Sequence, residues 1–457
     1  MKDLTSGSVA KHLLQTTGFM LVTMIFQTLY FLVDLYWVGR LGKEAVAAVS
    51  VAGNLAFIVL AVTQMLSVGT TTRVSHAAGR KDRERANFAS NQSQSLGIAC
   101  GLLFLGVAMW LRKDYASALA ADARTEELAG EYLLWFIPAM ALQFPMVSMS
   151  AALRGTGNFK PGMVVQTGTV ILNIVLAPLL MFGIGTGRPL GVAGAAIASL
   201  IALALGTAWL GLYFRGSTAY LHFRPAEWKP HVDEWTSMLK VGLPAGAEFA
   251  LMSIYMVIVY AVSRPFGSAA QAGFGIGLRV LQACFLPVVA LGIAVAPVAG
   301  QNFGARHGDR VRATFRAGAA MACAMMLAAT ALCFFGAAGI MRIFSTDAEV
   351  IRIGSEYLRI LAWSFVASGV IFVSSSMFQA MGNTIPPLLA SFGRMCVVSV
   401  SVLVFSGMAG FDLGWIWYLS AVTVWGHLAA NLLLLRRELR VKLPQEASSF
   451  QLPASSA

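Results

Sequence analysis

The 457-residue sequence is rich in apolar residues and poor in charge: 57% of its residues are hydrophobic, 12% are charged, and the mean hydropathy is +0.71. Soluble globular domains carry about 25% charged residues, so this composition excludes that class and predicts a multi-span membrane protein. The net charge of +12 would suggest nucleic-acid binding in a soluble chain. Here the basic residues lie in short loops between apolar runs, as in membrane proteins generally, and we expect no nucleic-acid partner.

The cysteines and histidines give no sign of a metal site or of a disulfide framework. The five cysteines fall singly in apolar segments without a CxxC pair, and the six histidines show no HExxH spacing. No nucleophile–base constellation is visible within the apolar segments either. The sequence therefore favours a protein that is not an enzyme and that has no resident cofactor.

Apolar runs punctuated by charged residues, glycine and proline predict twelve membrane-spanning helices. At about 1.5 Å per residue, each run is long enough to cross a bilayer. The predicted spans are residues 13–38, 45–72, 88–111, 128–152, 161–183, 192–214, 240–263, 270–299, 314–338, 355–381, 384–406 and 413–435. Alternate loops differ strongly in their lysine and arginine content, with basic clusters at residues 80–85 and 306–316. This bias predicts that both termini lie in the cytoplasm.

An internal repeat divides the chain into two halves. The motif that ends at Asn158 recurs at Asn383, and Gly42 and Gly267 open similar segments at the same offset along the chain. The basic loop DRERA recurs as DRVRA at nearly this offset. Because each half holds an even number of spans, the halves are expected to be parallel repeats. Paired repeats of this kind rock about a central cavity in transporters that work by alternating access.

The predicted fold is an all-α integral membrane protein with twelve transmembrane helices in two six-helix lobes around a central cavity. We expect an N-lobe over residues 1–214, a cytoplasmic inter-lobe loop over 215–239 and a C-lobe over 240–435. Residues 436–457 are polar and basic, and we expect them to form a cytoplasmic tail.

Asp34, in the first span, is the residue around which we build the functional interpretation. A carboxylate inside the bilayer costs about 2.5–3.5 kcal/mol on insertion scales, so such a group is a functional candidate by default. Gln27 and Tyr30 share its helix face, and Asn173 of the fifth span would complete a polar cluster. We predict that Asp34 takes up and releases a cation, most simply a proton. The alternative is an interfacial Asp34 that only pairs with Arg40.

Glu248, in the seventh span, is the second intramembrane carboxylate. No basic residue lies within one helical turn of it, so we predict a role in binding a cation or the substrate. The alternative is a purely structural hydrogen bond. Arg279 and Arg394 also fall in apolar segments, where they either pair with Glu248 or extend to the membrane surface.

Several stretches resemble one known family of transporters. FLVDLYWVGRLGKEAVAAVS, AALRGTGNFKP, GVAGAAIAS, VGLPAGAE and GIAVAPVAGQNFGARHGDRVRA are similar, in this order, to segments of multidrug and toxic compound extrusion (MATE) transporters. The resemblance covers nearly the whole chain. It is closer to the DNA-damage-inducible and archaeal-type branch than to the other bacterial branch.

The resemblance implies an exporter of organic cations and other amphipathic compounds that is driven by an inward flow of protons or sodium ions. In the similar branch an acidic residue of the first span carries the coupling. Asp34 matches that residue, and Gln27, Tyr30 and Asn173 match its polar neighbours. Glu248 matches the glutamate of the family's second-half cation site.

Three positions depart from the family pattern. A second aspartate often follows the asparagine of the fifth span, but Ala177 stands at that position. The aspartate of the tenth span that accompanies the seventh-span glutamate in sodium-coupled members is replaced by Ser368. The proline usual in the first span is Phe19, although its repeat mate Pro244 is present. These departures weaken the case for a sodium site and for a gate formed by a bent first helix.

Together these observations predict a monomeric, proton-coupled antiporter of the cell inner membrane that exports cationic or amphipathic small molecules. A sodium-coupled multidrug exporter is one alternative. A lipid-linked oligosaccharide flippase of the same superfamily is another, and it would be expected to have a more cationic central cavity than the few arginines of the first-half spans allow.

Overall fold

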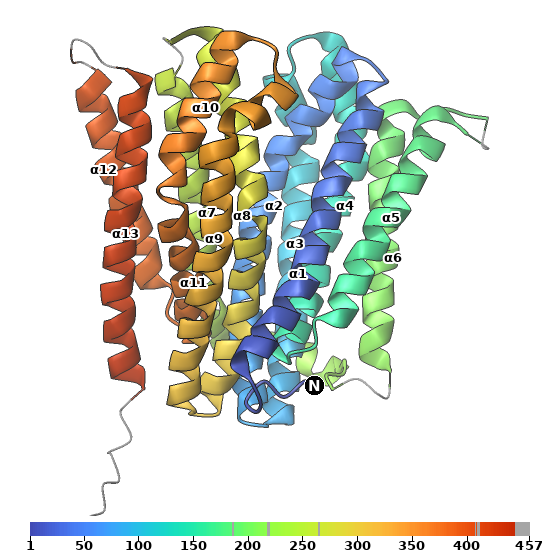
Figure 1. Ribbon diagram of the computed structural model, residues 1–457. Coiled ribbons are helices and arrows are strands. Elements are labelled where there is room, and N and C mark those ends of the chain that lie inside the picture. Colours follow the sequence, from blue (N-terminus) through green and yellow to red (C-terminus); the bar gives the residue numbers. More distant parts are fainter. Residues whose placement is uncertain (185–186, 217–219, 264–265, 407, 409–411, 444–457) are drawn as a thin grey trace, which may run out of the picture.

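The computed structural model describes residues 1–184, 187–216, 220–263, 266–406, 408 and 412–443, and this part of the chain folds into helices without a strand. The helices are α1 (Val9–Gly39), α2 (Lys43–Gly79), α3 (Arg83–Leu119), α4 (Ala123–Gly155), α5 (Lys160–Phe182), α6 (Gly191–Arg215), the short 3-10 helix η1 (Pro225–Trp228), α7 (Val232–Ser263), α8 (Gly267–Gly304), α9 (Gly308–Phe344), α10 (Ala348–Ala362), α11 (Phe365–Ala380), α12 (Ile385–Ser406) and α13 (Leu413–Lys442). Of the tail expected over residues 436–457, residues 436–442 belong to α13 instead, and the part beyond residue 443 lies outside the described residues. We call the end of the bundle that holds the N-terminus and the last turn of α13, at the bottom of Figure 1, the terminal side, and the opposite end the far side.

The helices agree with the predicted spans. Within the described residues, ten helices are individually long and apolar enough to cross a membrane, and α10 with α11 forms an eleventh candidate. The 32-residue α7 has the required length as well. Each predicted span lies within one helix, or within the α10–α11 pair, and no predicted span runs past the end of its helix by more than one residue. The prediction of an all-helical, multi-span fold is confirmed.

The tenth predicted span, residues 355–381, is not one straight helix. It contains a break between α10 and α11, whose axes differ by 55°. At the break the carbonyl of Leu361 accepts hydrogen bonds from both the amide and the hydroxyl of Ser364, at 2.9 and 2.8 Å, which ends α10 in a tight turn. An apolar run carries no signal for such a turn, because both half-helices need the same composition to lie in the membrane.

The internal repeat appears in the backbone as well as in the sequence. We call two residues repeat mates when they are separated by the same offset as Asn158 and Asn383. Three pairs of repeat mates adopt positive φ angles: Gly42 and Gly267 (110° and 88°), Lys81 and Arg306 (59° and 61°), and Gly157 and Gly382 (77° and 72°). Positive φ is uncommon for residues other than glycine. Its recurrence at matched positions after α2 and after α8 shows that the two halves share their helix ends, which confirms the predicted repeat.

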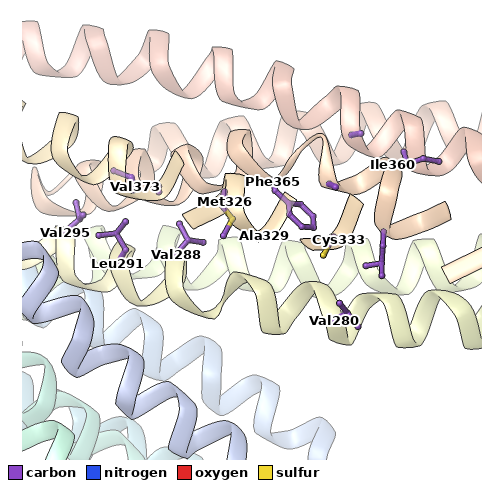
Figure 2. Packing of buried hydrophobic residues seen from close by; sticks show 14 of the residues in the cluster. Val280, Val288, Leu291, Val295, Met326, Ala329, Cys333, Ile360, Phe365 and Val373 are labelled. Carbon is purple, nitrogen blue, oxygen red and sulfur yellow. The ribbon is translucent and has the colours of Figure 1, made fainter. Parts of the chain in front are cut away.

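Two hydrophobic clusters form the cores of the two lobes. Residues of α2 to α6 dominate one cluster, and residues of α8 to α13 dominate the other, which includes Leu291, Met326 and Phe365 (Figure 2). The first helix of each half crosses between the lobes. Leu13 of α1 is buried in the second-half cluster, and Met238 of α7 is buried in the first-half cluster.

The lobes meet through close backbone contacts on the terminal side. A Cβ atom added at Gly79 would overlap the backbone of Gln301, and one added at Gly304 would overlap the backbone of His76. The two glycines are repeat mates of each other, and so are the two residues that they contact. The repeats therefore touch each other reciprocally, at positions where only glycine fits.

Hydrogen bonds repeat this reciprocal arrangement. The Nε2 atom of His76 lies 2.6 Å from the carbonyl oxygen of Ala380, while Gln301 Nε2 donates to the carbonyl oxygen of Gly155 at 2.9 Å. His76 and Gln301 are repeat mates, and so are Ala380 and Gly155. Each lobe thus bonds to the end of the other lobe's fourth span.

Small residues also bring α7 against α2. A Cβ atom at Gly246 would lie 2.9 Å from the carbonyl oxygen of Ala61, and one at Gly242 would overlap the backbone of Met65. This small-xxx-small spacing allows two helix backbones to approach closely. Further toward the far side of α2, Ile58 is 56% exposed. The close contacts between α2 and the second half therefore lie on the terminal-side portion of α2.

The segment before α1 acts as a strap between the lobes. The amide of Lys2 donates to the carbonyl of Thr156 at 3.0 Å. The amide of the fully buried Leu4 donates to Gln301 Oε1 at 3.0 Å, and its carbonyl accepts from Asn302 Nδ2 at 3.1 Å. One short segment thus bonds to the first half and to the second half at once.

The linker before α7 is held by the first half. Buried side chains of α3 accept hydrogen bonds from its backbone: Asn91 from the amide of Arg224, and Gln92 from the amide of His231, both at 3.0 Å. At the start of α7, Glu234 is 3% exposed and forms ion pairs with Arg73 of α2, at 2.8 Å, and with Arg85 of α3. The linker and the first turn of α7 are therefore fixed to the N-terminal half.

Candidate functional site

Asp34 lies on the far-side half of α1, a single continuous helix that contacts α5 in its own half. Its side chain is half-buried, and Oδ1 is buried without a hydrogen-bond partner among the described residues. Arg40 does not pair with it. The Arg40 guanidinium instead donates to the hydroxyl of Tyr36 and lies 4.8 and 5.3 Å from the ring centroids of Tyr36 and Trp37. The geometry therefore disagrees with the alternative in which Asp34 serves only as an ion-pair partner of Arg40.

A hydrogen-bonded row of polar side chains lies near Asp34. Ser199 of α6 stands at its centre, with its Oγ 3.1 Å from the Tyr30 hydroxyl and 3.0 Å from Asn173 Nδ2, which donates to it. Asn173 and Ser199 are buried. Asp34 itself follows Tyr30 by about one turn on α1. The row joins α1, α5 and α6 through side chains that are neutral.

The structure brings together only part of the predicted cluster. Tyr30 and Asn173 meet through Ser199, whereas Gln27 is exposed on α1 and makes no hydrogen bond to them within the described part of the chain. Sequence reasoning missed Ser199. The signal for Ser199 was a single hydroxyl in the small-residue run of the sixth span, where serine is common as a packing residue.

Glu248 occupies a separate position in the second half. Its Oε1 accepts a hydrogen bond from Ser391 Oγ of α12 at 2.9 Å, and its side chain is half-buried. Arg394, one turn after Ser391, has its Nε 3.5 Å from Thr423 Oγ1 of α13, while Arg279 is exposed. The two intramembrane carboxylates thus lie on different helix pairs, α1–α5 and α7–α12.

The N-terminal cluster offers oxygen atoms and a carboxylate but no soft ligand. Among the residues that the structure describes, no group of three His, Cys, Asp or Glu side chains is placed to hold a metal ion. An unpartnered carboxylate oxygen beside hydroxyl and amide groups suits a proton or another hard cation, because such cations prefer oxygen.

Comparison with known proteins identifies the family. The family model described as MatE matches residues 20–179 and 244–405, which is more than half of the chain and includes both halves of the repeat. The chain belongs to this family. Its repeat, its two lobes and the assignment made from sequence motifs to the MATE transporters agree with this match.

Curated relatives cover most of this MATE-family chain at low identity. It is similar to the probable multidrug resistance protein YoeA of Bacillus subtilis, with 26% identity over 84% of both chains. It is also similar to the multidrug export protein MepA of Staphylococcus haemolyticus, with 24% identity over 93% of both chains. These relatives are named as resistance and export proteins, which agrees with the expectation of a transporter and not an enzyme.

Solved structures share the fold of the MATE-family chain. A crystal structure of a MATE transporter in its bent conformation superposes with a TM-score of 0.90 at 23% identity, and covers 96% of this chain and 97% of that chain. A transporter of the MOP superfamily from Pyrococcus furiosus gives a TM-score of 0.88 at the same identity, with 96% and 98% covered. The two-lobe, twelve-span architecture expected from the sequence is therefore confirmed.

Proposed function

We propose that this MATE-family protein is a cation-coupled antiporter, driven most simply by protons, that exports organic cations and other amphipathic toxic compounds from the cell. The observation that carries the proposal is Asp34 Oδ1, which is buried in a membrane-spanning helix and has no hydrogen-bond partner among the described residues. A buried carboxylate oxygen without a donor is costly, and binding a proton or another cation removes that cost. The resistance and export proteins to which the chain is similar support the substrate class.

In the proposed cycle Asp34 binds a proton from the far side and becomes neutral. Neutralisation removes a charge from the membrane interior and converts the carboxylate into a hydrogen-bond donor. The Tyr30 hydroxyl can turn toward or away from Ser199, because either of the two oxygens can be the donor. The row from Tyr30 to Asn173 can therefore adjust its hydrogen bonds to the protonation state of Asp34 without moving its helices.

The contacts between the lobes support alternating access with the terminal side closed. We place this side in the cytoplasm because its loops carry most of the lysines and arginines. The close fit at Gly79 and Gly304, together with the strap around Leu4, blocks passage between the lobes at this end. Opening toward the cytoplasm requires all of these contacts to separate, while those within each lobe stay intact.

The driving force is sufficient for useful export. One proton moving through 100 mV releases about 2.3 kcal/mol. At about 1.4 kcal/mol per tenfold, this energy supports a gradient of roughly 50-fold for a neutral substrate. We assign Glu248 a secondary role in cation or substrate binding, because its Oε1 is already bonded to Ser391.

Efflux of a fluorescent cationic dye in everted vesicles of the inner membrane tests the proposal. Asp34→Asn should abolish proton-driven efflux, because the amide cannot bind and release a proton. Asp114→Asn, at an exposed position near the far-side end of α3, is the matched control and should leave efflux unchanged. Unchanged efflux in Asp34→Asn would exclude Asp34 from coupling, and efflux that follows a sodium gradient alone would replace the proton by sodium.

A further inference from the structure

The bend between α10 and α11 accompanies a groove on the far side of the second half. The groove has a volume of about 860 Å³ and lies between α9, α10 and α13. Arg342 of α9, Arg352, Ser355 and Arg359 of α10, and Tyr418 of α13 are among its lining residues. Three arginines therefore gather on the side of the bundle where the loops hold few basic residues.

The charges of the groove are mostly uncompensated. Glu356 is the one carboxylate among its lining residues, and its Oε2 is 3.9 Å from Arg352 Nη1, the longest of the ion pairs in the described chain. In the part of the chain that the structure describes, Arg359 makes one hydrogen bond, and it is long: its Nε lies 3.4 Å from the carbonyl oxygen of Phe334. The guanidinium groups of the groove thus retain most of their capacity to bind an anion.

A buried donor lies beside these arginines. Ser355 is 5% exposed, and its Oγ has no hydrogen-bond partner within the residues that the structure describes. Buried hydroxyls are normally paired, so an unpaired one at the wall of a cationic groove indicates a ligand that supplies an acceptor.

The groove lies at the level of the headgroup layer when the bundle is centred in a bilayer. The 37 residues of α9 extend about 55 Å, compared with about 30 Å for the hydrocarbon core. Arg359 bonds to Phe334, which precedes the end of α9 at Phe344 by roughly 15 Å along the axis. In a helix centred on the membrane, Arg359 therefore lies near the edge of the hydrocarbon, and Arg342 lies further out among the headgroups.

Exposed apolar side chains continue the groove toward the hydrocarbon. Phe335, next to the Phe334 carbonyl, is 82% exposed, and Trp363, at the bend, is 65% exposed. A free anion would make no use of this surface, whereas the acyl chains of a lipid would cover it.

The other lobe lacks these groups. Asp122 and Asp347 are repeat mates that accept hydrogen bonds at the starts of α4 and α10, and they fix the register between the two helices. In that register, the α10 residues of the groove have apolar, small or acidic counterparts. Arg352 corresponds to Glu127, Ser355 to Gly130, and Arg359 to Leu134. The cationic groove is therefore a feature of the second lobe and not a general property of the repeat.

We propose that this groove binds the phosphate of an acidic phospholipid from the leaflet on the far side. Arg352 and Arg359 pair with phosphate oxygens, Ser355 donates its hydroxyl, and the acyl chains lie along Phe335 and Trp363. Arginine suits this role because its planar guanidinium binds phosphate through two parallel hydrogen bonds.

Native mass spectrometry of the full chain in detergent, titrated with phosphatidylglycerol, tests the proposal. The double variant Arg352→Gln/Arg359→Gln should weaken binding of one tightly held lipid roughly 30-fold, because each cation near the surface contributes about fivefold. Ser355→Ala should weaken it less. The control Lys113→Gln/Arg124→Gln removes the same charge from the far side of the first half and should leave the tight site unchanged.

Two further ligands separate the lipid from its alternatives. Phosphatidylcholine with the same acyl chains should bind more weakly than phosphatidylglycerol, and inorganic phosphate should not displace the lipid. Equal binding of both lipids, displacement by inorganic phosphate, or equal effects of the groove and control variants would overturn the proposal. Replacing Arg359 also removes its hydrogen bond to Phe334, which could lower the stability of the fold. Arg342→Gln therefore provides a second variant, outside α10. It should weaken lipid binding as well, without lowering the melting temperature of the lipid-free protein.

Discussion

The two lobes keep the same turns but hold different polar groups in their interiors. In the first lobe, Asn173 and Ser199 form a buried hydrogen bond between α5 and α6. Their repeat mates in the second lobe are Val398 and Val424, which are also buried but apolar. The two valines show that apolar side chains can fill these positions. Packing alone therefore does not require the polar pair of the first lobe. The comparison thus favours a specific role for the polar row of the first lobe.

The reverse comparison gives the same result for the second lobe. Glu248 and its donor Ser391 correspond to Thr23 and Gln166 in the first lobe, where no carboxylate is present. Each lobe therefore has its own intramembrane acid at an unrelated position. The repeat explains how the helix ends turn and how the halves meet, while the chemistry of each half has diverged.

The fourth helix of each repeat shows that local sequence can mislead about helix breaks. Pro138 lies inside α4, which remains a single helix from Ala123 to Gly155. Its repeat mate is Trp363, where α10 ends and the axis turns by 55°. Proline removes one hydrogen bond, but neighbouring helices can hold such a helix together in the membrane. The break after α10 comes from the turn at Ser364 and not from a residue that breaks helices.

Outside the coupling carboxylate, the reciprocal glycine contacts provide the largest expected effect. Gly79→Ala and Gly304→Ala should each lower dye efflux at least tenfold and to a similar extent, because each new methyl group overlaps backbone of the other lobe and prevents closure of the terminal side. Gly53→Ala on α2, where a Cβ meets nothing within 4 Å, is the control. Wild-type efflux in both variants, at equal protein levels, would contradict the assignment of these contacts to closure.

The polar row of the first lobe predicts a smaller effect. Ser199→Val copies the second lobe at this position and leaves Tyr30 and Asn173 without their shared partner. Loss of one partner in a buried hydrogen bond costs about 1–3 kcal/mol, so efflux should fall roughly tenfold and the melting temperature should decrease. Ser391→Ala, the corresponding change beside Glu248, should affect proton-driven efflux less. An equal loss in both variants would argue against a special role for the first lobe.

The smallest effect concerns the start of α4. Hydrogen bonds from the amide and hydroxyl of Thr125 lower the pKa of Asp122. Because this pKa is lower in the folded than in the unfolded chain, the stabilisation is present above the unfolded value, about 4, and is lost as the pH falls through the folded value. The melting temperature, measured in detergent, should therefore fall less steeply with decreasing acidic pH in Asp122→Asn than in the wild-type protein. An unchanged acid limb would show that this cap does not contribute.

Much of the fold could be predicted from the sequence, because long apolar runs and motifs that recur at one fixed offset are strong signals. Less of the site could be predicted. Polar side chains at the start of α3, such as Asn91 and Gln92, are unfavourable in a membrane-spanning helix when the sequence is considered alone. The structure explains them, because they bind the backbone of the linker. Gln27 shares a helix face with Tyr30 in sequence, but it is exposed while Tyr30 reaches Ser199, because helical spacing alone does not determine which residues of a neighbouring helix lie within reach.

Proton flux in proteoliposomes tests the central claim most directly. With a proton gradient imposed and no sodium present, addition of the exported dye should accelerate proton movement through the wild-type protein and through Glu248→Gln. It should have no effect on Asp34→Asn, because only Asp34 is proposed to carry the coupled proton. Dye-dependent proton flux in Asp34→Asn, at wild-type rates, would contradict the assignment of coupling to the first lobe.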